Sequence, residues 1–210
     1  MPLSALQQRI LAIVGEVTSD DDVGLAGGAA LLAWDIGDRL TRDLDFFATG
    51  PAVVDAVSGR VREALLRNGL RAVVARESPG FVRFEVSDDV DVTELDIAWD
   101  ARIRDLKVTQ YGAVLDRDEL AADKVLALYG RAEARDFVDV FRLLALYSRE
   151  QLSELAFEKD RGFAPSAFAE SLRSVARRDR FEFDCDDATF DALISEFADW
   201  QREIVLGTSQ

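Results

Sequence analysis

Two aspartates two positions apart, Asp43 and Asp45, are the residues in this sequence best suited to chemistry. Polar and apolar residues alternate around them, which predicts a β-strand. Successive strand side chains point to opposite faces, so both carboxylates share one face while Leu44 and Phe46 enter the core. Adjacent like charges repel unless a cation neutralises them, and Mg²⁺ takes carboxylate oxygens together with substrate phosphates. The pair therefore predicts a divalent-metal site, the alternative being a solvent-facing acidic pair on an edge strand.

A third carboxylate lies in a second strand-like segment, Val92 to Trp99. Its alternation turns Leu95 and Ile97 inward and Glu94 and Asp96 the other way. If this strand lies beside the first one, Asp96 completes a set of three carboxylates. Such a third group bridges two metal ions or accepts the proton of an attacking hydroxyl. For Asp96 alone, a solvated strand residue is the alternative.

A glycine pair, Gly27-Gly28, precedes a short helix predicted to begin at Ala29. Glycines at such a turn let backbone N–H groups approach a phosphate, and a helix N-terminus adds positive potential. Arg39 or Arg42, just before the aspartates, could then hold triphosphate oxygens. A tight turn without any ligand is the alternative.

The composition limits both the chemistry and the class of protein. The 210 residues include no histidine and one cysteine, which excludes a Ser-His-Asp triad, His-ligated zinc and an internal disulfide. A formal net charge of −15 argues against passive adhesion to nucleic acid, whose affinity comes largely from phosphate neutralisation. The apolar runs are too short to span a bilayer, and the N-terminus is typical of an amphipathic helix rather than a signal peptide. We therefore expect a cytoplasmic protein with no membrane partner.

Helical and strand-like segments alternate up to about residue 115, and helices follow. The sequence thus predicts an α+β fold, with a mixed sheet and flanking helices over residues 1–115 and an all-helical part over residues 116–210. The predicted helices span about 3–17, 29–34, 51–68, 120–130, 135–147, 151–159, 166–177 and 189–206, and the predicted strands span 23–26, 44–48, 71–76, 81–87 and 92–99, with a further strand-like stretch at 181–183.

The helical half offers a lysine and several acids. Lys124 lies beside apolar neighbours and could reach a triphosphate as a point charge, the alternative being a surface lysine. Arg135 and Asp139 are four residues apart, which also suits a simple helix-surface salt bridge. Asp136 near the predicted helix start suits stabilisation of the helix dipole. The arginines between 173 and 180 indicate either a solvated helix end or contact with an RNA backbone.

In their order and spacing, these motifs resemble those of the AbiEii/AbiGii nucleotidyltransferase toxins. That family belongs to the DNA-polymerase-β-like superfamily and forms the toxin half of type IV toxin–antitoxin and abortive-infection systems. The resemblance covers roughly residues 23 to 145. It is carried by Gly27-Gly28, by Arg39-x-Thr41-x-Asp43-x-Asp45-Phe46, by Asp123-Lys124 and Arg131, and by Arg135-Asp136-x-x-Asp139.

The resemblance implies a nucleotidyltransferase-type mixed sheet and a role for each matching position. Asp43, Asp45 and Asp96 would bind Mg²⁺, and Thr41 would lie at the nucleotide phosphates. Gly28 occupies the place where the wider superfamily often has a serine, so backbone amides would replace that hydroxyl.

For the helical part, the resemblance implies that Lys124 and Asp139 take the family's catalytic lysine and aspartate positions and that residues 116–210 complete the active-site cleft. It also implies an activity: transfer of a nucleoside monophosphate from an NTP to an RNA acceptor, with release of pyrophosphate. The implied acceptor is the 3′ end of a tRNA, and a separately encoded antitoxin is the implied partner.

Two other functions stay open at the level of sequence. The acceptor could be a small molecule such as an antibiotic, which the acidic net charge slightly favours because polyanionic RNA needs a basic path. The chain could also be a non-catalytic module that binds a nucleotide or a protein partner, and the intact pair of Asp43 and Asp45 argues against that function.

Overall fold

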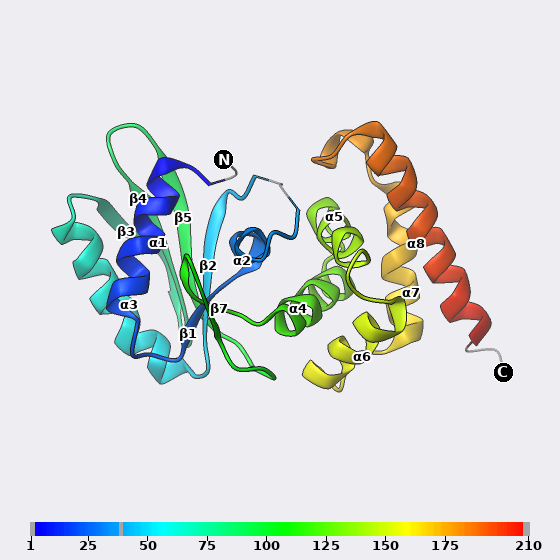
Figure 1. Cartoon of the computed structure of the whole chain (residues 1–210), viewed down its shortest axis with the longest axis horizontal. Helices are drawn as coiled ribbons and strands as arrows, with labels where there is room; N and C mark the ends of the chain where they lie inside the picture. Colours follow the sequence, from blue (N-terminus) through cyan, green and yellow to red (C-terminus); the bar gives the residue numbers. More distant parts are fainter. Residues whose placement is uncertain (1–2, 38–39, 208–210) are drawn as a thin grey trace. The chain divides into compact units, whose positions relative to one another are not determined.

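A computed structural model of the chain describes residues 3–37 and 40–207 (Figure 1). Its internal contacts divide the chain into two compact units, Met1–Arg117 and Asp118–Gln210, called unit 1 and unit 2 below. Unit 1 contains a mixed sheet with flanking helices, and the described part of unit 2 contains helices and no strand. The predicted α+β fold class is therefore confirmed.

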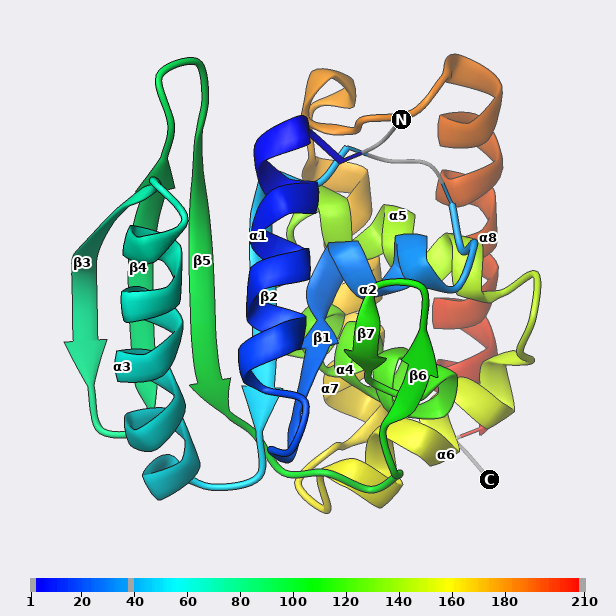
Figure 2. The same cartoon turned by 60° about the vertical axis from the view of Figure 1, so that its left-hand side comes forward.

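The sheet of unit 1 has seven strands in the order β3-β4-β5-β2-β1-β7-β6 (Figure 2). The central strand β2 pairs in parallel with β5 and antiparallel with β1. Strands β3, β4 and β5 form an antiparallel meander, while β1 pairs in parallel with β7. The strand bounds are β1 Val23–Ala26, β2 Asp43–Ala48, β3 Arg71–Ser78, β4 Phe81–Ser87, β5 Val92–Trp99, β6 Lys107–Thr109 and β7 Gly112–Val114.

Helices cover the two faces of this sheet unequally. Figure 1 shows α1 (Ala5–Val17) and α3 (Pro51–Arg67) on one face and the short α2 (Gly27–Ala33) on the other. Helix α1 begins at a capping box between Ser4 and Gln7, and α3 begins with a proline at its first turn. The strand side chains below α1 and α3 are almost fully buried, so the core of unit 1 lies on that face. The opposite face is left to carry the polar side chains of β2 and β5.

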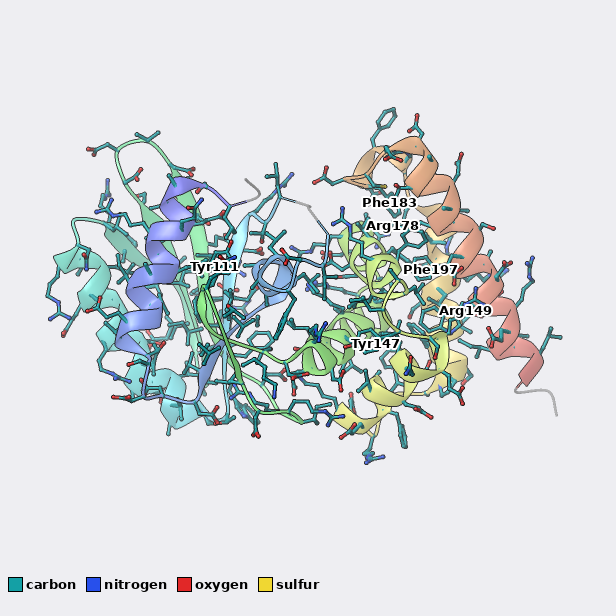
Figure 3. All side chains as sticks on the ribbon, viewed as in Figure 1. Tyr111, Tyr147, Arg149, Arg178, Phe183 and Phe197 are labelled. Atoms are coloured by element: carbon teal, nitrogen blue, oxygen red, sulfur yellow. The ribbon has the colours of Figure 1, made fainter. Side chains whose placement is uncertain are left out.

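Unit 2 is built from helices around an aromatic core. The ring centroids of Phe137 and Phe197 lie 5.2 Å apart, and those of Phe137 and Phe183 lie 6.4 Å apart (Figure 3 labels Phe183 and Phe197). The helix bounds are α4 Arg117–Gly130 (its first residue belonging to unit 1), α5 Ala134–Leu143, α6 Arg149–Lys159, α7 Pro165–Arg173 and α8 Asp187–Gly207, with 3₁₀ turns η1 at Ser174–Arg177 and η2 at Arg180–Glu182.

Several local expectations were wrong. Helix α2 begins at Gly27 rather than after the glycine pair, and the strand-like stretch at 181–183 overlaps the 3₁₀ turn η2. The β6–β7 hairpin was not predicted, because strands of three residues are too short to show a periodic pattern. The helix predicted over 135–147 ends at Leu143, and the one predicted over 166–177 changes to 3₁₀ geometry after Arg173.

Within the described ranges, no helix is both long and apolar enough to span a membrane.

Candidate active site

Strand β2 places two carboxylates on the sheet face opposite α1 and α3. Burial alternates strictly along the strand: Leu44 and Phe46 are buried, while Asp43 and Asp45 are half-buried. The apolar side chains anchor the strand in the core, so the two acids are held at neighbouring positions on the other face. This arrangement agrees with the prediction from the alternating sequence.

Strand β5 brings two more acids beside them. In the parallel pairing of β2 with β5, Asp43 lies opposite Glu94 and Asp45 lies opposite Asp96. Side chains opposite each other on adjacent strands share a face, so four carboxylates occupy a small area of the sheet. The sequence predicted Asp96 as the third carboxylate only if the two strands lie side by side. The pairing of β2 with β5 meets that condition.

An arginine from the next strand binds Asp96. The Nε atom of Arg83 donates to Oδ1 of Asp96 at 2.7 Å, and its Nη2 atom donates to Oδ2 at 2.6 Å. The remaining terminal nitrogen, Nη1, lies 2.8 Å from Oε2 of Glu94. These hydrogen bonds raise the pKa of the Arg83 guanidinium above its usual value, with the bond to Asp96 as the main cause. Sequence reasoning missed Arg83, because only the register of β4 with β5 places it opposite Asp96.

Two of the three predicted metal ligands on this face, Asp43 and Asp45, suit a hard cation, while the third, Asp96, is bound to Arg83. Asp43 and Asp45 supply the carboxylate oxygens that Mg²⁺ prefers. Across residues 3–37 and 40–207, however, no three acidic, histidine or cysteine side chains are grouped so that they could hold an ion together. Asp96 is 6% exposed and directs both oxygens to Arg83, a residue of the strand on the other side of β5 from β2. An ion held by Asp43 and Asp45 would therefore share Asp96 with that guanidinium.

Gly27 lies directly against this acidic face. It adopts a left-handed backbone conformation with φ of +61°, and a β-carbon there would come within 1.9 Å of Oδ2 of Asp45. Only glycine combines that conformation with such a close approach. The first residue of α2 therefore lies directly against the Asp45 carboxylate, and Gly28 follows as the second residue of the helix.

Thr41 contacts Asp43 through its hydroxyl. The Oγ1 atom lies 2.9 Å from the backbone oxygen of Asp43 and 3.3 Å from its Oδ1 atom. From α1, Gln7 donates to the backbone oxygen of Thr41 and to the hydroxyl of Thr93, which itself donates to the backbone oxygen of Arg42. This buried network fixes the entry to β2 against β5. Arg39, the other predicted nucleotide-binding residue, lies outside the described residues.

In unit 2 the structure brings together the two side chains singled out by the sequence. Nζ of Lys124 on α4 lies 2.8 Å from Oδ2 of Asp139 on α5, and both side chains are at least nine-tenths buried. Buried charges require such pairing, because an isolated one loses its hydration without compensation. Lys124 is thus a buried side chain, which removes the surface-lysine alternative.

The neighbouring motif residues have structural contacts. Arg131 donates through two nitrogens to Asp136, which is fully buried and also accepts the backbone N–H of Glu133 in a capping box. Arg135 donates to Glu133, at 2.9 Å, a local contact beside that capping box.

The arginine-rich stretch is partly occupied by internal contacts as well. Arg178 donates to the backbone oxygen of Ala132, and Arg180 donates to the backbone oxygens of Phe183 and Cys185 (Figure 3 labels Arg178 and Phe183). These contacts favour the structural alternative for those two arginines.

Sequence reasoning missed a second buried ion cluster in unit 2. Lys159, at the end of α6, lies 2.7 Å from Glu119 and also contacts Asp123, both on α4. The side chains of Lys159 and Glu119 are 4% and 1% exposed. The spacing of Glu119 and Asp123, one helical turn apart next to apolar residues, was the available signal.

The sequence model of one protein family matches residues 9–204, nearly the whole chain. Its description is "Nucleotidyl transferase AbiEii toxin, Type IV TA system". The chain belongs to this family. The AbiEii resemblance seen in the motifs is therefore confirmed, and the protein is a nucleotidyltransferase of a type IV toxin–antitoxin family.

Solved structures share the fold of this AbiEii-family chain. A putative nucleotidyltransferase from Helicobacter pylori has 19% sequence identity and a TM-score of 0.61, over 96% of this chain and 97% of that chain. MenT4, a nucleotidyltransferase toxin from Mycobacterium tuberculosis H37Rv, has 18% identity and a TM-score of 0.62, over 93% of this chain and 81% of that chain. No curated protein matches the sequence significantly.

Proposed function

We propose that this AbiEii-family chain transfers a nucleoside monophosphate from an NTP to a hydroxyl of an RNA acceptor, the 3′ end of a tRNA. The reaction depends on Mg²⁺, takes place in the cytoplasm and arrests translation. Family membership supports nucleotidyl transfer, and the motif resemblance supports the tRNA acceptor and an antitoxin encoded as a separate protein.

The observation that carries the proposal is the alignment of Asp43 and Asp45 on one face of β2, with Asp96 opposite Asp45. In the transfer, the acceptor hydroxyl passes its proton to a carboxylate of this face, its oxygen bonds the α-phosphorus, and the bond from the α-phosphorus to the oxygen of the β-phosphate breaks, which releases pyrophosphate. Mg²⁺ would be held by Asp43 and Asp45, with Asp96, which here binds Arg83, as the proposed third ligand, and would neutralise the charge on the phosphates. These three carboxylates are thus the proposed metal ligands.

The chain's own residues supply binding and orientation. Gly27 and Gly28 offer backbone N–H groups to the triphosphate, and Arg39 and Thr41 complete the nucleotide-binding set. Thr41 also holds Asp43 through its hydroxyl. Because phosphoryl-group transfer needs mainly positioning and electrostatic stabilisation, rigid placement of these groups accounts for most of the catalysis.

Unit 2 supplies the remaining proposed groups. Lys124 is the cation for the triphosphate, and Asp139 holds its ammonium in place by the 2.8 Å contact. We propose that residues 116–210 form a helical domain that contributes these groups to the reaction, and that residues 1–115 form the nucleotidyltransferase core.

The test is incubation of the purified protein with Mg²⁺ and each labelled NTP in turn, with bulk tRNA, total RNA or aminoglycosides as acceptors. Label on the tRNA 3′ end, absent without Mg²⁺, is expected. The Asp43→Ala variant should lose both labelling and toxicity, whereas Glu85→Gln on the same sheet should keep both, since Glu85 lies on β4 and β5 separates it from Asp43 and Asp45. Retained transfer by Asp43→Ala would refute the metal site, and label on aminoglycosides alone would refute the RNA acceptor.

A further inference from the structure

Four acids and one arginine share a small area of the sheet in unit 1. Asp43 and Asp45 of β2 lie opposite Glu94 and Asp96 of β5, and Arg83 of β4 lies opposite Asp96. Two neighbouring acids, Glu94 and Asp96, are both within hydrogen-bond distance of Arg83. Close carboxylates of equal charge repel, so the fold needs positive charge at this place whether or not a metal ion is bound.

The contact of Arg83 with Asp96 has the geometry of a strong ion pair. Two parallel N–H donors meet two carboxylate oxygens at 2.7 and 2.6 Å, the fork arrangement specific to arginine. The Asp96 side chain is 9% exposed, so little water competes for it, while the Arg83 side chain is 34% exposed and has solvent beside it. The arginine is thus the more exposed partner of the pair.

We propose that Arg83 is the built-in counter-ion of Asp96 and competes with the divalent cation for that carboxylate. The proposal rests on the metal site of the proposed function and adds a positioning residue to it. In the absence of the ion, the guanidinium neutralises Asp96 and holds it in line with Asp45. The cation has to compete with the positive charge of Arg83 for the Asp96 carboxylate. The strength of that ion pair therefore sets the ion concentration at which the site is half occupied.

The position next to it on the sheet provides a matched control. Arg76 of β3 lies opposite Arg83 in the register and on the same face. Its guanidinium lies over the ring of Phe81, 5.5 Å from the centroid, and does not form the fork with Asp96. Arg76→Gln therefore removes one positive charge from the same row of the sheet while it leaves the ion pair with Asp96 in place.

The experiment measures Mn²⁺ binding by electron paramagnetic resonance on the full-length protein, for wild type, Arg83→Gln, Arg83→Lys and Arg76→Gln. We expect Arg83→Gln to bind Mn²⁺ about tenfold more tightly, equivalent to ~1.4 kcal/mol. Arg83→Lys, which keeps the charge but not the fork, is expected to fall between it and wild type, and to carry the comparison if Arg83→Gln does not fold. Arg76→Gln should stay within about twofold of wild type, since its charge does not compete for Asp96.

Thermal unfolding gives the second readout. Without metal, Arg83→Gln should unfold at a lower temperature than wild type, and Mg²⁺ should raise its Tm by more than it raises that of wild type. Unchanged or weaker Mn²⁺ binding by both Arg83 variants would overturn the competition. If wild type, Asp43→Asn and Arg83→Gln all bind no Mn²⁺, the metal site of the proposed function fails as well, which separates the two failures.

Discussion

Gly27 and Asp45 are in such close contact that a β-carbon on the first would come within 1.9 Å of Oδ2 of the second. The contact links the start of α2 to the strand that carries the acidic pair. Since Gly27 also has φ of +61°, two independent constraints select glycine at this position. The glycine is thus required by the site that surrounds it as well as by the turn.

Gly27→Ala should damage both stability and transfer. The β-carbon strains the left-handed backbone and pushes the Asp45 carboxylate aside, so we expect a loss of about 1–3 kcal/mol in the free energy of unfolding. A displacement of about 1 Å of a positioned group lowers turnover about 10²-fold. Urea unfolding and labelled-NTP transfer measure the two effects. Gly59→Ala in the middle of α3, where a β-carbon meets nothing within 4 Å, should instead stabilise the protein by about 0.5–1 kcal/mol.

Thr41→Val should lower transfer while the fold is kept. Valine has nearly the same shape but cannot donate to Asp43. The lost hydrogen bond, which is shortest to the backbone oxygen, corresponds to about 0.5–1.5 kcal/mol, or roughly 2- to 10-fold in kcat/KM. Thr41→Ser keeps the hydroxyl and should retain most of the activity. Steady-state kinetics with varied NTP measures both variants, and equal loss in the two would contradict a role for the hydroxyl.

Lys124 and Asp139 should behave as a coupled buried pair. Lys124→Met removes the buried ammonium 2.8 Å from the Asp139 carboxylate, so we expect a loss of about 3–5 kcal/mol in stability. The double variant Lys124→Met/Asp139→Leu should recover much of that loss because both charges are gone. Chemical denaturation completes the double-mutant cycle. If Lys124 also contacts the triphosphate as proposed, the recovered double variant stays inactive, and an active double variant would limit the pair to a structural role.

Lys159 should matter more for the stability of unit 2 than its position at a helix end suggests. Its buried contacts with Glu119 and Asp123 join α6 to α4, so Lys159→Met should cost about 3–5 kcal/mol. Lys107 is the control, because its side chain is 48% exposed and lies 3.5 Å from Asp116. Lys107→Met should change stability by less than about 1 kcal/mol. Thermal unfolding of both variants measures the two stability losses. Equally small losses would show that the buried cluster around Lys159 contributes little to stability.

Cys185 offers a test by pH, since it is the only cysteine of the chain. Partial burial raises the pKa of its thiol above the usual value. The thiolate is the reactive form, so a raised pKa leaves less of it at pH 8 and shifts the rise of the alkylation rate to higher pH. Iodoacetamide labelling of the folded protein should therefore be slower at pH 8 than labelling in urea. Equal rates in the two conditions would contradict the shift.

The sequence alone determined the properties that depend on local pattern. The alternation from Asp43 to Phe46 was enough to place both acids on one strand face, because side-chain direction in a strand depends only on odd or even position. The change from mixed elements to helices also follows from local periodicity. The order of motifs that resembles the AbiEii family can be read directly from the sequence. Both the family and the fold class were therefore predicted correctly from residues.

The tertiary structure alone decided which of these residues meet. Asp45 and Asp96 are neighbours because β2 and β5 pair in a particular register, and Arg83 reaches Asp96 because β4 pairs next to it. Lys159 is buried because α6 ends beside α4. Such contacts join positions far apart in the chain, and they depend on how whole elements pack, which the period of a single strand or helix does not encode.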